Sequence, residues 1–211
     1  MRIGADEAGK GPVLGSMFAA AVRAPPEAIP EGVDDSKRLS PARREALAAG
    51  LRNDDRVEVG VHEVPVDRID GDEDVNTLTV LAQAEAVAAV ARDGDGGVLD
   101  AGDTSADRFA RRVAERVPAD VDLRAEHSAD ETYLLVSAAS VLAKVERDAH
   151  VEGLAEAYGD VGSGYPSDPT TREFLRNYVE THGGLPDCAR RSWSTCDDAL
   201  AAAEQSALDS F

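Results

Sequence analysis

Two adjacent carboxylates, Asp6 and Glu7, are followed closely by a glycine-lysine-glycine stretch, Gly9-Lys10-Gly11. Carboxylate oxygens are ligands that divalent cations such as Mg²⁺ prefer, and glycines let a backbone come close to a phosphate. The stretch therefore predicts a site for a divalent metal ion and a phosphate. The same residues also fit a surface β-turn with solvated charges, and this stretch alone does not separate the two interpretations.

The residues around this stretch predict a strand, a turn and a second strand. An apolar start at Met1 and Ile3 leads into the carboxylates, and an apolar run resumes over 13–22. Neighbouring side chains of a strand point to opposite faces. We therefore expect the first strand to end at Asp6, with Glu7 already in the turn, if the two carboxylates share one site.

Two further carboxylates come at the ends of predicted elements. Asp100 ends the short apolar run 97–100, and Asp130 follows the predicted strand 121–125. A parallel or mixed sheet brings strand ends to one edge, where four such acids would repel each other unless cations lie among them. Mg²⁺ or Mn²⁺ suits these ligands, and two ions ~3.5–4 Å apart would activate water against a phosphodiester. The alternative is that most of these acids are ordinary surface residues among the 41 acidic ones.

The rest of the chain alternates helix and strand signals, which is typical of an α/β protein. Ser40 is an N-cap candidate, with Pro41 at the first helical position. Residues 57–64 alternate apolar and polar side chains and predict a half-exposed strand. Residues 182–198 read as irregular, and 199–211 as a short helix or a tail. Helices are predicted over 42–51, 75–91, 106–117, the second half of 131–159, and from Pro169 to about Tyr178.

Composition favours a single intracellular domain adapted to salt. The chain has 211 residues, 43% of them hydrophobic, without an apolar run that could span a bilayer or a charged-then-apolar leader. Its two cysteines, Cys188 and Cys196, are interpreted as free thiols, and an isolated disulfide or a remnant metal pair is the alternative. The net charge of −19 normally argues against a nucleic-acid partner, but at multimolar salt the Debye length is ~3 Å or less and repulsion is short-ranged. Only three lysines occur, Lys10, Lys37 and Lys144, and each lies in or beside a motif.

Six segments, in order along nearly the whole chain, resemble ribonuclease HII, more closely its archaeal branch. The resemblance implies an RNase H-like α/β fold with three layers, a central mixed five-stranded sheet and additional C-terminal helices. It implies a catalytic domain over 1–198 and a tail over 199–211. It also implies an endonuclease that cuts the RNA strand of RNA–DNA hybrids, and cuts 5′ of single ribonucleotides in duplex DNA, leaving a 3′-hydroxyl and a 5′-phosphate. The segments are IGADEAGKGPVLGSM, DDSKRLS, VLDAG, ADETYLLVSAASVLAKVERD, SGYPSDPTTREFL and RRSWST.

Carried over residue by residue, the resemblance makes the four carboxylates the metal ligands and catalytic residues. It implies that the backbone of the glycine loop senses the 2′-hydroxyl, the handle that distinguishes RNA from DNA. It implies that Tyr165 packs on the sugar after the ribonucleotide, although a turn tyrosine packing on the core is the alternative. Lys37 and Lys144 fall at positions expected to contact phosphate or steady the site, and a helix-surface cation is the alternative for Lys144. The metal ligands are Asp6, Glu7, Asp100 and Asp130, and the substrate residues are Gly9, Lys10, Gly11, Lys37, Lys144 and Tyr165.

One residue departs from the family pattern. The family loop usually reads glycine-arginine-glycine, whereas the middle residue here is Lys10. Lysine keeps the charge but lacks the planar fork of arginine. The departure leaves the metal chemistry in place and bears on the strictness of junction recognition.

The C-terminal residues resemble the peptide with which replication proteins bind the sliding clamp. They have the form Q-x-x-L-x-x-F, with Gln205, Leu208 and Phe211 at the defined positions. A terminal turn packing on its own domain is the alternative. The sequence thus predicts a cytoplasmic, monomeric, Mg²⁺- or Mn²⁺-dependent nuclease with RNA–DNA hybrid, ribonucleotide-containing DNA and a sliding clamp as partners, and no membrane. Another RNase H-like two-metal nuclease acting on DNA, or a non-enzymatic acidic clamp-associated protein, is the competing interpretation.

Overall fold

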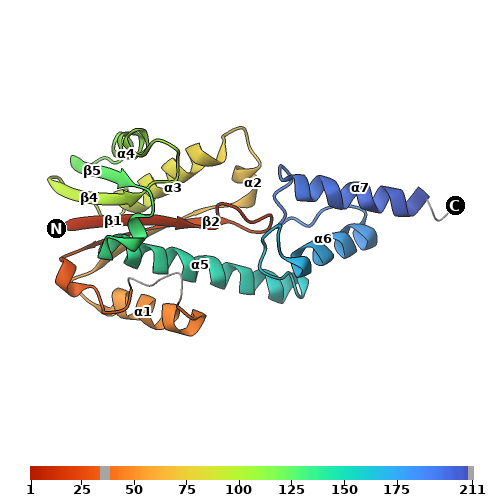
Figure 1. The fold of residues 1–211 in the computed structure, drawn as a ribbon, viewed down its shortest axis with the longest axis horizontal. Coiled ribbons are helices and arrows are strands. Elements are labelled where there is room, and N and C mark those ends of the chain that lie inside the picture. Colours follow the sequence, from red (N-terminus) through yellow and green to blue (C-terminus); the bar gives the residue numbers. More distant parts are fainter. Residues whose placement is uncertain (34–38, 209–211) are drawn as a thin grey trace. The chain divides into compact units, whose positions relative to one another are not determined.

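The structure is a computed structural model that describes residues 1–33 and 39–208, with side chains described as far as Gln205. The chain folds into two compact units. Figure 1 shows the fold, with colours that follow the sequence. Unit 1 contains Met1–Ala8, Met17–Val64 and Asp74–Arg147. Unit 2 contains Gly9–Ser16, Pro65–Glu73 and Asp148–Phe211.

Unit 1 is built on a five-stranded mixed sheet with the strand order β3-β2-β1-β4-β5. Strands β1, β2 and β3 pair in antiparallel fashion, while β4 pairs in parallel with both β1 and β5. This arrangement confirms the predicted mixed sheet of an α/β fold. The strands are β1 (Arg2–Ala8), β2 (Met17–Ala24), β3 (Glu58–Val64), β4 (Asp95–Asp100) and β5 (Val121–Glu126).

Helices cover both faces of this sheet. Helices α3 and α4 pack on one face, and α1 and the first part of α5 pack on the other (Figure 1). A Cβ added at Gly4 of β1 would lie 2.3 Å from the backbone of Leu135 in α5, so β1 and α5 approach more closely than any side chain allows. The helices are α1 (Pro41–Asn53), α3 (Val75–Ala88), α4 (Ala106–Ala114) and α5 (Leu134–Tyr158), with short 3₁₀ turns η1 (Pro26–Ala28) and η2 (Ala129–Glu131).

Unit 2 is helical and has its own hydrophobic core. Its helices are α2 (Val66–Ile69), α6 (Pro169–His182) and α7 (Ser194–Leu208), and α5 belongs to it from Asp148 onward. The core brings Val13 and Leu14 of the N-terminal loop together with residues of α5, α6 and α7. Cys188 and Cys196 lie in this core as free thiols, as the sequence predicted.

Local signals placed several element boundaries correctly. The Ser40 hydroxyl accepts a hydrogen bond from the Arg43 amide at the start of α1, and the Asp168 carboxylate accepts one from Thr170 at the start of α6. Other boundaries differ. Helix α7 begins at Ser194 inside the segment expected to be irregular. Strand β2 begins at Met17 rather than residue 13, because Val13 and Leu14 pack into the core of unit 2. None of the described helices is long and apolar enough to cross a membrane.

Candidate active site

Three of the predicted carboxylates lie where β1 and β4 end their pairing. The parallel ladder between these strands runs to the pair Ala5 and Leu99, so Asp6 and Asp100 are the next residues on the two strands. Asp100 is also the last residue of β4. The sheet therefore brings Asp6, Glu7 and Asp100 to one edge, as the strand-end argument predicted.

The expectation that β1 ends at Asp6 is wrong. Strand β1 runs to Ala8 because its pairing with β2 continues as far as the partners Ala8 and Phe18. Asp6 and Glu7 consequently leave the strand on opposite faces: Asp6 bonds to Ser140 of α5, whereas Glu7 bonds to Gln83 of α3. The two carboxylates still interact electrostatically, since the charge of Glu7 raises the pKa of Asp6.

The pKa of Asp6 is strongly perturbed. Only 6% of the residue is exposed, and burial raises the pKa of its carboxyl well above the usual range. The charges of Glu7 and then Asp100 raise this pKa further, while the Ser140 hydroxyl opposes the shift by donating a hydrogen bond. The Lys144 ammonium donates to the same hydroxyl at 2.7 Å. Lys144 is thus linked to Asp6 through one side chain, which places this predicted residue beside the carboxylates.

Gln83 of α3, a residue the sequence analysis did not select, holds Glu7 in place. Its Nε2 donates to Glu7 Oε2 at 2.6 Å and to the Asp100 carbonyl at 3.0 Å, and the residue is completely buried. Two acceptors fix the orientation of the amide, since a flipped Gln83 would turn an oxygen toward both. A Cβ added at Gly102 would lie 3.1 Å from Glu7 Oε1 and 2.5 Å from Thr79 Cγ2. Glu7 therefore lies in a closely fitted slot.

Asp130 reaches the same region through η2. The amide of its neighbour Ala129 donates to Asp100 Oδ1 at 2.7 Å, and Asp130 itself is 6% exposed. Ser128, before the 3₁₀ turn, adopts a left-handed backbone with φ of 54°. Ser137 of α5 donates its hydroxyl to the Asp130 carbonyl, which ties the turn to the start of the helix. The structure thus joins the Asp130 turn to Asp100.

The donor set suits a hard divalent cation. Among residues 1–33 and 39–208 no three His, Cys, Asp or Glu side chains already have the arrangement of a finished metal site. The chemistry nevertheless fits, because Glu7 and Asp100 are both close enough for their charges to repel that of the buried Asp6. A cation among these oxygens would remove the repulsion, and oxygen ligands select Mg²⁺ or Mn²⁺ over softer metals.

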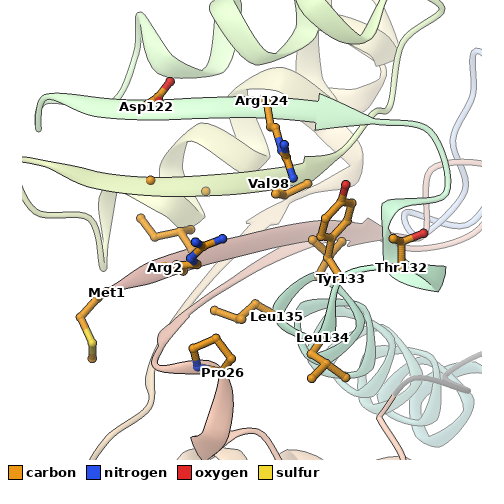
Figure 2. A pocket seen from close by; sticks show the side chains of 14 residues that line it. Met1, Arg2, Pro26, Val98, Asp122, Arg124, Thr132, Tyr133, Leu134 and Leu135 are labelled. Atoms are coloured by element: carbon orange, nitrogen blue, oxygen red, sulfur yellow. The ribbon is translucent and has the colours of Figure 1, made fainter.

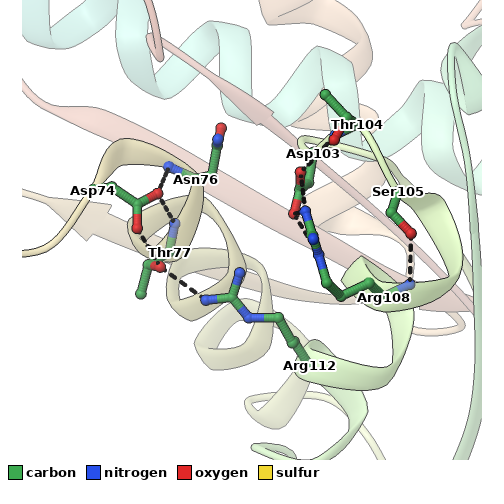
Figure 3. A network of polar contacts seen from close by, with 8 residues as sticks. All are labelled: Asp74, Asn76, Thr77, Asp103, Thr104, Ser105, Arg108 and Arg112. Carbon is green, nitrogen blue, oxygen red and sulfur yellow. Dashed lines mark hydrogen bonds and ion pairs between the residues drawn. The ribbon is translucent and has the colours of Figure 1, made fainter.

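Two acids elsewhere in unit 1, Asp103 and Asp74, have pKa shifts in the opposite direction. Asp103 makes an ion pair with Arg108 at 2.7 Å, and Asp74 caps α3 through Thr77, whose hydroxyl also accepts from Arg112 (Figure 3). Hydrogen bonds from these partners lower the pKa of the Asp103 and Asp74 carboxyls. The raised pKa of Asp6 therefore distinguishes it from acids with a structural role.

A cavity of about 560 Å³ opens in unit 1 beside the first residues of β1, away from the carboxylates. Arg2 and Arg124 point toward its centre, and Tyr133 and Leu135 form a wall (Figure 2). Arg2, which pairs with Gly96 of β4, lies four residues before Asp6 along β1. This separation corresponds to ~13 Å of strand. The cavity is thus separate from the carboxylate edge.

The predicted substrate loop lies in unit 2. Gly9 has a left-handed φ of 86°, and Gly11 is exposed. The Tyr165 ring lies against Gly11, since a Cβ added there would be 3.8 Å from Tyr165 Cε1, and Tyr165 is 40% exposed. The amides of Val13 and Leu14 both donate to the Gly164 carbonyl, which joins the two predicted substrate segments.

The remaining predicted residues lie at or beyond the limits of the described structure. Lys37 and Phe211 fall outside the described residues. Gln205 is exposed on α7, and Leu208 is the last residue of that helix.

Residues missed by the sequence analysis share one property: they act through long-range contacts. Gln83 is a polar residue in an otherwise apolar helical pattern, and that mismatch was the available signal. Ser140 is one of several small residues in the segment 131–159, and Arg190 lies in a segment predicted to be irregular. Arg190 donates to the carbonyls of Gly9, Lys10 and Gly15.

Comparison with known proteins agrees with this geometry. The family model described as Ribonuclease HII matches residues 3–196. A ribonuclease HII of Haloarcula marismortui is 66% identical over 212 residues, covering all of both chains. The ribonuclease H2 of Pyrococcus horikoshii OT3 superposes with a TM-score of 0.88 at 34% identity, over 97% of this chain and 99% of the other. The RNase HII in the PCNA complex from Archaeoglobus fulgidus has a TM-score of 0.84 at 37% identity, over 94% and 96%.

Relatives from salt-loving archaea agree with the expectation drawn from charge and lysine content. These matches span the whole chain and carry the same fold as the sheet and helices described above. The chain therefore belongs to the ribonuclease HII family, a family of divalent-metal-dependent ribonuclease H enzymes that hydrolyse phosphodiesters.

Proposed function

We propose that this protein cuts the RNA strand of RNA–DNA hybrids, and cuts duplex DNA 5′ of a single embedded ribonucleotide, leaving a 3′-hydroxyl and a 5′-phosphate. Its biological role would be ribonucleotide excision and removal of RNA primers. The observation that carries the proposal is the position of Asp6, Glu7 and Asp100 at one edge of the sheet, where the charges of Glu7 and Asp100 act on the buried Asp6. Such an arrangement favours binding of hard cations over any purely structural role.

In the proposed reaction Asp6, Glu7, Asp100 and Asp130 hold two divalent ions, Mg²⁺ or Mn²⁺. When bound, the ions supply an activated water and charge stabilisation at the leaving oxygen. The protein positions the ligands: Gln83 fixes Glu7, and Ser140 fixes Asp6. The Lys144 ammonium, bonded to Ser140, adds a positive charge near the phosphate to be cut.

Recognition of the ribonucleotide falls to the other predicted residues. Backbone amides of the Gly9-Lys10-Gly11 loop would contact the 2′-hydroxyl, and Tyr165 would pack on the next sugar. Neither contact reads a base edge, so we expect no base-sequence preference. Lys37 and Lys144 would contact phosphates, and this sequence-independent contribution would weaken with salt.

The decisive experiment compares two duplexes that differ in one atom. A labelled DNA duplex with one embedded ribonucleotide, and the same duplex without it, are incubated with the protein and Mg²⁺ in concentrated potassium chloride. We expect a single cut 5′ of the ribonucleotide and an intact all-DNA duplex. Cutting of both duplexes would favour another RNase H-like DNA nuclease, and cutting of neither would favour a non-enzymatic scaffold.

We also propose that the C-terminal residues bind a sliding clamp through Gln205, Leu208 and Phe211. Support comes from the Q-x-x-L-x-x-F pattern and from the relative of Archaeoglobus fulgidus, whose structure is that of a complex with PCNA. In a pull-down with purified clamp, Phe211→Ala should abolish binding, whereas Ser210→Ala in the same tail should not. Unchanged binding by Phe211→Ala would reject this interaction.

Three smaller proposals complete this assignment. The catalytic part would span 1–198 and the tail 199–211, although α7 runs through this boundary. The protein would act as a monomer, which light scattering of the purified chain tests directly. We also propose that the protein acts in the cytoplasm, on the ribonucleotide-containing DNA and RNA–DNA hybrids named above.

A further inference from the structure

Arg190 is a completely buried arginine in unit 2 that bonds to one loop with all three of its nitrogens. Its Nη2 donates to the Gly9 carbonyl at 2.6 Å and its Nη1 to the Lys10 carbonyl at 3.0 Å. Its Nε donates to the Gly15 carbonyl at 2.8 Å. One side chain therefore fixes the backbone at both ends of the loop 9–15.

Trp193 adds a fourth contact of the same kind. Its Nε1 donates to the Gly11 carbonyl at 3.3 Å, and the Arg190 guanidinium lies 5.1 Å from the centre of its ring. The Trp193 amide in turn donates to the Arg190 carbonyl at 3.0 Å. The carbonyls of Gly9, Lys10 and Gly11 thus all accept bonds from this arginine–tryptophan pair.

The direction of these carbonyls determines the direction of the amides. In a trans peptide unit the C=O and the following N–H point in opposite directions. Because the Gly9 and Lys10 carbonyls point at Arg190, the amides of Lys10 and Gly11 point away from it. Gly11 is exposed and the next residue, Pro12, has no amide hydrogen, so the amides of Lys10 and Gly11 are two adjacent donors on the side of the loop away from Arg190.

We propose that Arg190 is the positioning residue for ribonucleotide recognition: by holding these carbonyls inward, it aims the amides of Lys10 and Gly11 at the 2′-hydroxyl. The inference rests on the proposed function, in which this loop senses that hydroxyl. Preformed donors avoid the free-energy cost of ordering a glycine loop at the moment of binding.

The chemistry of the Arg190 side chain supports a role in positioning the loop rather than a role in filling the core. A buried guanidinium is costly to desolvate, so an apolar residue of similar length would fill the same space more favourably. Arginine offers donors in three directions from a rigid plane, whereas lysine offers a single point charge. Only the planar fork reaches the Gly9, Lys10 and Gly15 carbonyls at once.

The test measures binding rather than cleavage, in an Asp100→Asn background that we expect not to cut. The readout is the ratio of the dissociation constant for the all-DNA duplex to that for the duplex with one ribonucleotide, with Mg²⁺ present. We expect a ratio of ~10 or more in this background, which corresponds to one good hydrogen bond to the 2′-hydroxyl. A ratio near one in the background protein itself would refute the proposed function and not the role of Arg190.

Adding Arg190→Lys should lower this ratio to near one, mainly by weakening binding of the ribonucleotide duplex. Arg23→Lys is the matched control, since Arg23 is also a buried arginine but bonds to the carboxylates of Asp95 and Glu58. We expect the control to leave the ratio unchanged. An equal loss of affinity for both duplexes in Arg190→Lys would overturn the proposal, because it would show support of the fold alone.

A milder variant keeps the proposal testable if Arg190→Lys does not fold. Trp193→Phe removes only the donor to the Gly11 carbonyl and leaves an aromatic ring beside Arg190. The ratio should fall by a few-fold, on the order of one neutral hydrogen bond. An unchanged ratio in this folded variant would count against the proposal.

Discussion

In unit 1, buried polar groups gather like charges: Asp6 is surrounded by Glu7 and Asp100, and its pKa is raised. In unit 2, buried polar groups do the reverse, since Arg190 and Trp193 supply donors to the backbone carbonyls of the glycine loop. One region is electrostatically incomplete without a bound cation, whereas the other is satisfied by its own side chains. The proposed metal site and the proposed recognition loop thus depend on burial in opposite ways.

This difference has an energetic consequence. A cluster of repelling carboxylates lowers stability until a cation binds, so the metal contributes binding energy to the folded state. A loop held by internal hydrogen bonds has its conformation before the ligand arrives, and the ligand adds little stability to it. Changes in the first region should therefore act on metal binding and catalysis, and changes in the second on discrimination between substrates.

Asp100→Asn should have the largest effect. It removes a predicted metal ligand, so cleavage should fall by ~10³-fold or more. Without metal, the variant should be as stable as the parent or more stable, because one charge that raises the Asp6 pKa is gone. Cleavage assays and thermal unfolding measure the two effects, and Asp122→Asn on β5 is the matched control for an exposed acid.

Addition of Mg²⁺ provides the cross-check on Asp100→Asn. The parent should unfold at a higher temperature with Mg²⁺ than without, and Asp100→Asn should show a smaller rise. A variant that keeps more than about a tenth of the parent cleavage rate would contradict the role of Asp100, since loss of a metal ligand costs far more.

Gln83→Met should have the next largest effect, confined to metal binding. The substitution keeps the volume but removes the donor to Glu7 and to the Asp100 carbonyl. Residues that orient metal ligands typically contribute 10–100-fold to metal affinity. The Mg²⁺ concentration for half-maximal cleavage should rise by ~10–100-fold, with a smaller change in the rate at saturating Mg²⁺.

Thr79→Val is the control for Gln83→Met. Thr79 is a completely buried polar residue one turn away on α3, and its hydroxyl donates to the Val75 carbonyl. Its substitution removes a buried hydrogen bond without touching a carboxylate. If both variants shifted the Mg²⁺ dependence equally, Gln83 would have no specific role in holding Glu7.

Sequence patterns located most of the elements and the acids at strand ends, although α7 begins inside a segment expected to be irregular. Ser40 with Pro41, and Pro169, located the starts of two helices, and Asp100 was identified because a short apolar run ends on it. These features depend on neighbours along the chain. The motifs also named Asp6 and Glu7, but period-two reasoning placed Glu7 in a turn, since the sequence does not show how far β1 pairs with β2.

Contacts between segments far apart along the chain could not be predicted from sequence patterns. Gln83 and Glu7 are 76 positions apart, and Arg190 and Gly9 are 181 apart. A single glutamine in an apolar helix, or an arginine in an irregular segment, fits many surroundings equally well. Their partners follow from tertiary packing alone, which periodicity and capping rules do not describe.

Alkaline pH should weaken the core that carries the glycine loop. Burial raises the pKa of the Cys188 and Cys196 thiols from 9.0 to about 11, and the Gly15 amide donates to the Cys188 carbonyl. A raised pKa means that the folded state favours the neutral thiol. The stabilisation is therefore complete below pH 9 and is lost as the pH rises from 9 toward 11, by up to ~3 kcal/mol per thiol.

Urea unfolding at pH 8 and pH 10 measures this effect. The parent should lose stability between these values, and a Cys188→Ala, Cys196→Ala variant should lose less, starting from a lower value because two buried side chains are truncated. Equal losses in both proteins would exclude the thiols as the source of the pH dependence.

Lys10→Arg, which restores the usual family residue, should have the smallest effect. If recognition depends on backbone amides aimed by Arg190, the side chain of residue 10 contributes only charge, and both residues carry one. Cleavage of the ribonucleotide duplex and its preference over the all-DNA duplex should each change by no more than ~3-fold, the range of a weak exposed interaction.

Lys10→Gln, which removes the charge, should weaken binding of both duplexes alike and flatten the salt dependence of binding. A gain in ribonucleotide preference well beyond ~3-fold in Lys10→Arg would mean that the guanidinium itself reads the junction, and the loop would then be a side-chain reader rather than a backbone reader.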